Sequence, residues 1–486
     1  MTARAEPPDL NEGPRLRTMQ VFTLCVGTII GVGWITVLGS WLSQAGALGA
    51  TLAFVTGGLV LIPVGLSYAR ISTLITDPGG EIAYARVMFG GAAGFMAGWV
   101  LFLAFIAVCA FEAISLGWVT AALFPGLPSA ELYEVFGSSV GGLDLVIGVL
   151  GLVVVTLANL AGPKGTGRFS DLTTYALLAA AVIFVGAGAI FGRPDNLRPL
   201  FNTDLPGGAW AGFVAVLVTT PFWFAGFNTA AQAVTAELRS GTARAAGLAV
   251  VAAIGASTVF YCGVILAASA VAPRDFILSQ DLPAAAAFTY ALGSFGKIVL
   301  VAGLLGILST FNAVFFAAVR VLMTLAALWK GQVRGLPQRP SVAAVITCFG
   351  LTLLITALGK TVILPIVNVT GICFTLMFAL VSLAAWRVRP TETRDDVFDL
   401  PGGRYMAALA LVLSLSMLAI AVASLWSVDG PAVELLILLA WLALGLPFSL
   451  WLKARTAASF DRPLEAHHGS EVLGSAPSDS GSRGGR

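Results

Sequence analysis

Apolar residues occur along this chain in long runs that are separated by shorter polar stretches. Each run holds about 17 to 30 residues, enough for a helix to cross a hydrocarbon core of roughly 30 Å. An Ala-rich stretch within the loop 273–296 predicts an additional short surface helix. The pattern predicts twelve membrane spans, near residues 18–42, 47–71, 94–123, 143–161, 174–191, 209–237, 245–272, 297–328, 341–358, 361–386, 405–426 and 432–452.

The composition agrees with this reading of the apolar runs. Of 486 residues, 58% are hydrophobic and only 11% are charged, whereas a soluble globular chain carries about 25% charged residues. This excludes a soluble enzyme and a disordered scaffold, and the net charge of +2 indicates no nucleic-acid partner. We therefore predict an all-α polytopic membrane protein that is surrounded by the lipid bilayer.

Histidine and cysteine usage predicts no metal ion, no cofactor and no enzymatic activity. His467 and His468 are adjacent in a polar C-terminal stretch, and the spans contain no histidine. The five cysteines fall within apolar runs without a CxxC pair, so they are interpreted as small buried residues.

Basic residues are distributed unevenly over the two sides of the predicted topology. If both termini and every second loop share one side, that side holds 22 of the 27 basic residues. Because cytoplasmic loops are enriched in Lys and Arg, we predict a plasma (inner) membrane protein with both termini in the cytoplasm. Residues 1–17 and 453–486 are predicted cytoplasmic tails, the second disordered, and no cleavable signal peptide is predicted.

Two spans contain helix-breaking residues near their middle. Span 1 contains Gly27, Gly31 and Gly33, and Gly31 lies roughly 20 Å from the start of the span. Span 6 combines Pro221 with Gly226. Non-helical backbone is tolerated in hydrocarbon only where it is buried in protein or lines a cavity, so both positions point to a cavity. Close helix packing is the alternative, because Gly27 and Gly31 also form a GxxxG pair.

The two interrupted spans open two consecutive sets of five spans, residues 18–191 and 209–386, which are followed by two more spans within 405–452. Interrupted segments at corresponding positions of two halves mark the midplane site of transporters. A broken helix presents amides that suit an anion and carbonyls that suit an ammonium group. The pattern therefore favours a carrier for a small zwitterion.

Four motifs follow one another in a recognisable order. They are the glycine-rich sequence 27–33, the sequence 78–84 (PGGEIAY) followed by FG at 89–90 and GW at 98–99, the sequence 224–227 (FAGF) followed by AE at 236–237, and the sequence 318–322 (AVRVL). In order and spacing they resemble the amino acid–polyamine–organocation transporters over roughly residues 15–390. The resemblance implies five plus five inverted repeats with two further helices. It also implies proton- or sodium-driven uptake, or exchange, of amino acids or related amines, with the substrate held on the broken backbones of helices 1 and 6.

The chain departs from this family at two positions that bear on mechanism. Many members carry glutamate where this chain has Asn228, which removes a charge from the site. Some proton-coupled members carry a lysine in helix 5, where this chain has Leu177. The second departure argues against a lysine-dependent proton mechanism.

We predict that the two breaks form one substrate-binding site. The aromatic side chains beside the second break are interpreted as a lid over the substrate, with ordinary packing as the alternative. The predicted substrate-binding residues are Thr28, Ile29, Gly31, Val32, Gly33, Phe222, Trp223, Phe224, Ala225, Gly226 and Asn228.

Five further residues are candidates for coupling or gating. Glu112 is the one acid well inside a span, where a charge is expensive. Three roles stay open for Glu112. It contacts a cation, a proton or the substrate's amine, it makes a structural hydrogen bond, or it lies in a vestibule without functional consequence. Ser309 and Thr310 are interpreted as sodium ligands or as interhelix hydrogen-bonding groups. Glu237 and Arg320 are candidates for an inner gate or a structural ion pair.

The predicted function is secondary active transport of an amino acid or related amine by alternating access. A substrate exchanger and a transporter-like sensor are the alternatives, whereas a channel would need a continuous polar stripe that the spans do not show. The coupling ion is H⁺ or Na⁺. Proton coupling through Glu112 is favoured, because burial disfavours the charged form of a carboxyl group.

Overall fold

The computed structural model describes residues 18–75, 79–161, 166–228, 243–330, 340–388, 398, 400–427 and 430–456. Among these residues, nine helices are long and apolar enough to cross a membrane. Three shorter apolar helices, Val21–Thr36, Gly208–Phe224 and Val342–Thr356, lie at predicted spans 1, 6 and 9. Together they account for the twelve predicted spans, so the prediction of an all-α polytopic membrane protein is confirmed.

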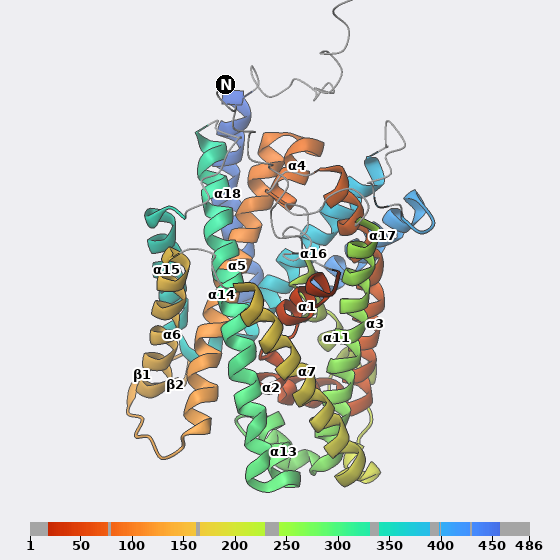
Figure 1. Ribbon diagram of the computed structural model, residues 1–486, viewed down its shortest axis with the longest axis vertical. Coiled ribbons are helices and arrows are strands. Elements are labelled where there is room, and N and C mark those ends of the chain that lie inside the picture. Colours follow the sequence, from red (N-terminus) through yellow and green to blue (C-terminus); the bar gives the residue numbers. More distant parts are fainter. Residues whose placement is uncertain are drawn as a thin grey trace, which may run out of the picture.

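The helices follow one another along the chain with two short antiparallel strand pairs between them (Figure 1). The helices are α1 (Thr18–Ile29), α2 (Gly33–Thr36), α3 (Leu38–Leu74), α4 (Glu81–Phe89), α5 (Gly91–Leu123), α6 (Gly142–Ala161), α7 (Thr166–Phe191), α8 (Gly208–Leu217), α9 (Thr220–Phe224), α11 (Ala243–Val271), α12 (Arg274–Leu278), α13 (Pro283–Leu292), α14 (Ile298–Trp329), α15 (Val342–Thr356), α16 (Ile363–Arg387), α17 (Arg404–Ser424) and α18 (Val433–Thr456). The strands are β1 (Glu131–Val135), β2 (Ser138–Gly141), β3 (Trp426–Ser427) and β4 (Gly430–Pro431), and 3-10 turns lie at Pro194–Leu197, Gly293–Lys297 and Gly359–Val362.

The chain turns from span 1 into span 2 at a single residue, Gly46. Its φ of 75° and ψ of 175° interrupt α3, and a side chain there would lie 2.8 Å from the carbonyl oxygen of Leu200. Glycine is the residue that adopts such a conformation without steric cost. The turn is held by hydrogen bonds from the Leu48 amide to Leu200 and from the Asn202 amide to Ala45.

The middle of the molecule is built around α5 and α14, which pack along each other. The apolar span of α5 is almost wholly buried. α11 packs along α3 and α1, and α16 packs along α5. Figure 1 shows α1 in the middle of the molecule, with α4 toward one end and α13 at the opposite end. This arrangement places the broken span 1 among α7, α11 and α14.

The outer helices expose apolar side chains. On α6 and α7, for example, Val154 is 60% exposed and Val182 is 74% exposed. Such a surface suits contact with hydrocarbon, because a water-facing helix carries charged or polar residues on its outer face. The helices therefore follow the pattern of a membrane bundle, in which apolar residues lie both inside and outside.

The prediction of a surface helix in the loop 273–296 is correct for the helix and wrong for its exposure. A helix forms, α13, but Ala284, Ala287 and Phe288 on it are fully buried. The Phe288 ring lies 4.5 Å from the Phe184 ring of α7, measured between centroids. Small alanine side chains allow α13 to approach its neighbours closely, so it closes one end of the bundle.

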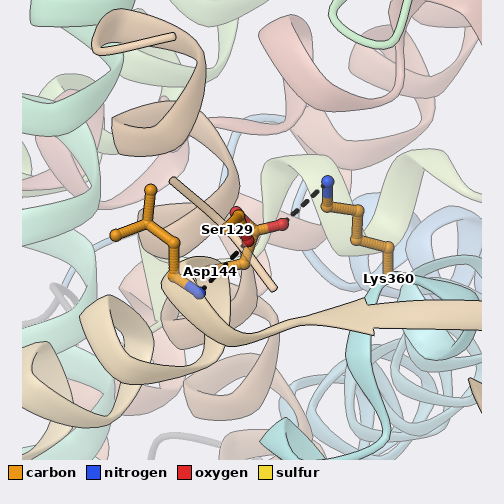
Figure 2. A network of polar contacts seen from close by, with 4 residues as sticks. Ser129, Asp144 and Lys360 are labelled. Atoms are coloured by element: carbon orange, nitrogen blue, oxygen red, sulfur yellow. Dashed lines mark hydrogen bonds and ion pairs between the residues drawn. The ribbon is translucent and has the colours of Figure 1, made fainter. Parts of the chain in front are cut away.

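The connection between α5 and α6, which lies between two predicted spans, forms the hairpin β1–β2. Figure 2 shows its polar contacts at the start of α6: Lys360 Nζ lies 2.9 Å from Asp144 Oδ2, and the Leu143 amide donates to Ser129 Oγ. The Tyr133 hydroxyl donates to the Ala357 carbonyl at 2.6 Å. These contacts tie the hairpin and the start of α6 to the connection between α15 and α16.

Candidate functional site

Span 1 is broken where its glycines predict a break. α1 ends at Ile29 and α2 begins at Gly33, and Ile30, Gly31 and Val32 between them are not helical. The Gly31 amide donates to the Ile29 carbonyl at 3.1 Å, so the chain turns tightly at the end of α1. The first amides of the segment that starts at Gly33 have no partner within that segment, as at any helix start.

Span 6 is broken just after α9. Gly226 has a φ of +132°, which glycine tolerates and other residues rarely adopt. The Gly226 amide donates to the side-chain oxygen of Asn228 at 3.0 Å. The prediction of a break in this span is therefore confirmed, and it falls at Ala225 and Gly226.

Asn228 supports this second break from outside the cavity described below. It is 1% exposed, and its Nδ2 atom donates to Glu81 Oε1 at 3.1 Å. The Tyr68 hydroxyl donates to the same oxygen at 3.0 Å. Asn228 therefore links the backbone of span 6 to the buried carboxyl group of Glu81, at the start of α4. A carboxyl group still lies close to this break although position 228 carries none.

The two breaks touch each other. A Cβ atom added to Gly226 would lie 2.6 Å from both the carbonyl carbon and the carbonyl oxygen of Thr28. The Tyr261 hydroxyl, on α11, lies 3.1 Å from the Ile29 carbonyl and 3.1 Å from the Trp223 carbonyl. Tyr261 therefore joins the end of α1 to the end of α9 with one donor.

A cavity of about 590 Å³, its open side included, lies at this junction. Eleven of the predicted site residues line it: Thr28, Ile29, Gly31, Val32, Gly33, Glu112, Phe222, Trp223, Ala225, Gly226 and Thr310. The structure thus brings residues from spans 1, 3, 6 and 8 to one place. Their role in holding a substrate stays a prediction.

Four predicted residues lie elsewhere, and one cannot be placed. Phe224 is fully buried against Tyr261, with 5.8 Å between ring centroids, so it packs behind the cavity. Asn228, Ser309 and Arg320 are likewise absent from the cavity wall. Glu237 lies outside the residues that the structure describes.

Glu112 brings a carboxyl group into the cavity wall while the residue is only 3% exposed. Its Oε1 atom faces the first break, because a Cβ atom added to Gly31 would lie 3.3 Å from it. The Thr310 hydroxyl is within hydrogen-bonding range of the carboxyl group. In the part of the chain that the structure describes, the buried Oε2 atom has no hydrogen-bond partner. An unpartnered buried oxygen is costly, so this atom is placed to take a proton or an ammonium group.

A family model described as amino acid permease matches residues 16–446 of the 486. The chain belongs to the amino acid permease family. This confirms the resemblance that the four motifs showed.

Three relatives of this permease illustrate the similarity. The methylthioribose transporter of Bacillus subtilis is 24% identical over 63% of this chain and 66% of its own length. The amino-acid permease RocE of the same organism is 23% identical over 78% of this chain and 82% of its own. The serine/threonine exchanger SteT, also of Bacillus subtilis, is 28% identical over 42% of this chain and 43% of its own. The chain thus spans less than two thirds of two of these relatives, and all three are named as transport proteins, not as enzymes.

The permease has an apolar residue, Leu177, at the position in span 5 where some proton-coupled members of the family carry a lysine. Leu177 is 1% exposed, and it lies 3.6 Å from the Cβ position of Gly306. The Thr310 hydroxyl donates to the Gly306 carbonyl at 2.9 Å.

Among the described residues, no group of three His, Cys, Asp or Glu side chains is arranged to hold a metal ion.

Seven cavity residues of the permease were not predicted from the sequence. Phe105 and Val108 lie seven and four positions before Glu112, so they share its helical face and were open to prediction. The others carry no local signal, because helix packing alone brings them to the cavity. The seven are Phe105, Val108, Phe111, Tyr261, Ala313, Val314 and Phe374.

Tyr261→Phe should lower the melting temperature of the permease and reduce substrate affinity by about tenfold. The change keeps the ring and removes the donor, which leaves two buried carbonyls short of a partner at a cost of about 1–3 kcal/mol. Thermal unfolding in detergent and ligand binding measure the two effects. Tyr290→Phe is the control, because Tyr290 is 58% exposed on α13. If the two variants behave alike, the Tyr261 hydroxyl does not hold the breaks together.

Proposed function

We propose that this permease is a secondary active carrier of an amino acid, which it holds between the breaks of spans 1 and 6. The observation that carries the proposal is the contact of the two breaks at one cavity, with Gly226 against Thr28. Free amides at the restart of span 1 suit a carboxylate. Glu112 and the carbonyl end of α1 suit an ammonium group. A zwitterionic amino acid matches both in one molecule.

The aromatic residues beside the second break support alternating access. A Cβ atom on Gly33 would overlap the Trp223 ring, so this ring lies directly against the restart of span 1. Trp223 also packs against Trp41 and Phe111, with ring centroids 5.2 Å and 6.1 Å apart. We propose that Trp223 and Phe222 form a lid on the α13 side of the substrate. Phe224 has no part in this lid, because it packs on the far side.

Glu112 is proposed as the coupling residue, and H⁺ as the coupling ion. It supplies the one carboxyl group in the cavity wall that the structure describes. In the sodium alternative, hydroxyls such as those of Ser309 and Thr310 would supply ligands. Thr310 already donates to its own helix, and Ser309 is absent from the cavity wall. The proposal also places the permease in the plasma membrane with both termini in the cytoplasm.

Uptake of radiolabelled L-amino acids into proteoliposomes tests the proposed function. Vesicles that contain the purified permease should accumulate at least one amino acid above the level of empty vesicles. If no amino acid or related amine enters or binds, the proposal is wrong.

Exchange is the second candidate function, and the similarity to an exchanger supports it. An obligatory exchanger should take up label only when unlabelled substrate is present inside the vesicles. A carrier that is driven by an ion gradient should accumulate label in vesicles that contain none. The same vesicles therefore separate the two mechanisms.

A further inference from the structure

We infer that the substrate is an amino acid with an uncharged, apolar side chain, selected by a wall of α5, α14 and α16. The inference rests on the proposed function and names the substrate class of the same cavity. It follows from where the polar groups of the cavity lie and from what the rest of the wall is made of.

In the described part of the wall, the one carboxyl group lies at the end where the substrate's amine belongs. Glu112 Oε1 faces Gly31 in the first break, and the buried Glu112 Oε2 has no hydrogen-bond partner among the described residues. The same end carries the backbone that suits the carboxylate of an amino acid. Because Glu112 is taken by the amine, no charged group of the described wall is left for a Lys, Arg, Asp or Glu side chain of the substrate.

The hydroxyl groups of the wall have already used their protons. Thr28 Oγ1 donates to the Leu24 carbonyl at 2.8 Å, and Thr310 Oγ1 donates to its own helix. The Tyr261 hydroxyl donates to the backbone of the two breaks. An acceptor group on the substrate's side chain would therefore leave water without finding a free hydroxyl proton in the described wall, which is unfavourable.

The remaining wall is apolar and comes from three helices. Phe105 of α5 and Phe374 of α16 form an aromatic pair with centroids 6.0 Å apart. Val108 of α5 and Ala313 and Val314 of α14 add aliphatic groups. Each methylene that such a wall removes from water is expected to raise affinity by about fourfold.

A competition series in proteoliposomes tests the side-chain preference. Alanine, 2-aminobutyrate, norvaline and norleucine should compete for uptake with affinities that rise about fourfold per methylene. Serine, lysine and glutamate should compete at least about tenfold less well than norvaline. Better competition by serine, lysine or glutamate than by norvaline would overturn the inference, and lysine would point to Glu112 as a side-chain partner instead.

A single isosteric change tests the wall itself. Val314→Thr keeps the shape of the side chain and adds a hydroxyl to the apolar wall. It should lower norvaline affinity by about tenfold and narrow the gap to serine. Val301→Thr is the matched control on the same helix, because Val301 is 45% exposed on the outside of α14. Equal selectivity of the two variants would overturn the inference.

Uptake and competition measurements distinguish a failure of the proposed function from a failure of the side-chain inference. If no amino acid is taken up or bound, the proposed function is wrong and the side-chain inference falls with it. If amino acids are taken up but the methylene series is flat or polar substrates win, only the side-chain inference is wrong.

Discussion

Gly31→Leu is expected to abolish substrate binding while the permease stays folded. Even a Cβ atom at this position would lie 3.3 Å from Glu112 Oε1, and a leucine side chain would extend into the space beyond it. That space is where the break, Glu112 and Thr310 meet. An overpacking cost of about 3 kcal/mol corresponds to a loss of affinity of roughly 150-fold. Binding of the best substrate, measured by thermal shift, should fall by that amount or below detection.

Gly186→Leu is the matched control for this variant. Gly186 lies on α7, and a Cβ atom there would meet nothing within 4 Å. The Gly186→Leu variant should bind substrate like the unchanged protein and elute as the same species in gel filtration. Full binding by Gly31→Leu would show that the glycines of span 1 serve helix packing, which is the alternative that the GxxxG pair suggested.

Glu112→Gln is expected to uncouple uptake from the proton gradient. With an acidic outside, a one-unit pH difference supplies about 1.4 kcal/mol per proton, enough for roughly tenfold accumulation of a neutral amino acid. The unchanged permease should reach this level and should not respond when sodium is replaced by potassium. The variant keeps the shape of the side chain but cannot take up the proton, so the gradient should no longer raise uptake. Exchange of label against internal substrate should survive with lower affinity, because the glutamine amide oxygen can still accept a hydrogen bond from the substrate's amine but carries no charge.

Glu131→Gln serves as the control for the loss of a carboxyl group. Glu131 is exposed on the β1–β2 hairpin and does not line the cavity. Its uptake should respond to the gradient like that of the unchanged protein. A requirement for sodium, or a Glu112→Gln permease that the gradient still drives, would show that Glu112 is not the coupling residue.

Local sequence was sufficient for the spans and for both breaks. The length of an apolar run decides whether a helix can cross a membrane, and this depends on no distant residue. Gly226 also acts locally, since its φ of +132° lets the backbone leave the helix at its own position. Glu112 stood out for the same kind of reason, because an acid within an apolar run is costly wherever it lies.

The sequence did not show which of two neighbouring residues in the same motif lines the cavity. Trp223 and Phe224 are adjacent, yet Trp223 lines the cavity and Phe224 packs behind it against Tyr261. Asn228 was predicted to face the substrate, whereas its side chain binds Gly226 and Glu81. Which way a side chain turns at a helix break depends on the backbone angles of the break, and these are set by the helices around it.

The sequence by itself determined the membrane class, the positions of twelve spans, the two interruptions and one buried acid, because each of these is a property of a short stretch of chain. Only the tertiary structure decided that the interruptions touch, that Tyr261 joins them, and that Phe105, Val314 and Phe374 complete the cavity. These residues come from helices that lie far apart along the chain. In hydrocarbon, burial of apolar surface does not favour one helix pair over another. Such helices associate through complementary shape and a few hydrogen bonds. No stretch of sequence carries that information alone.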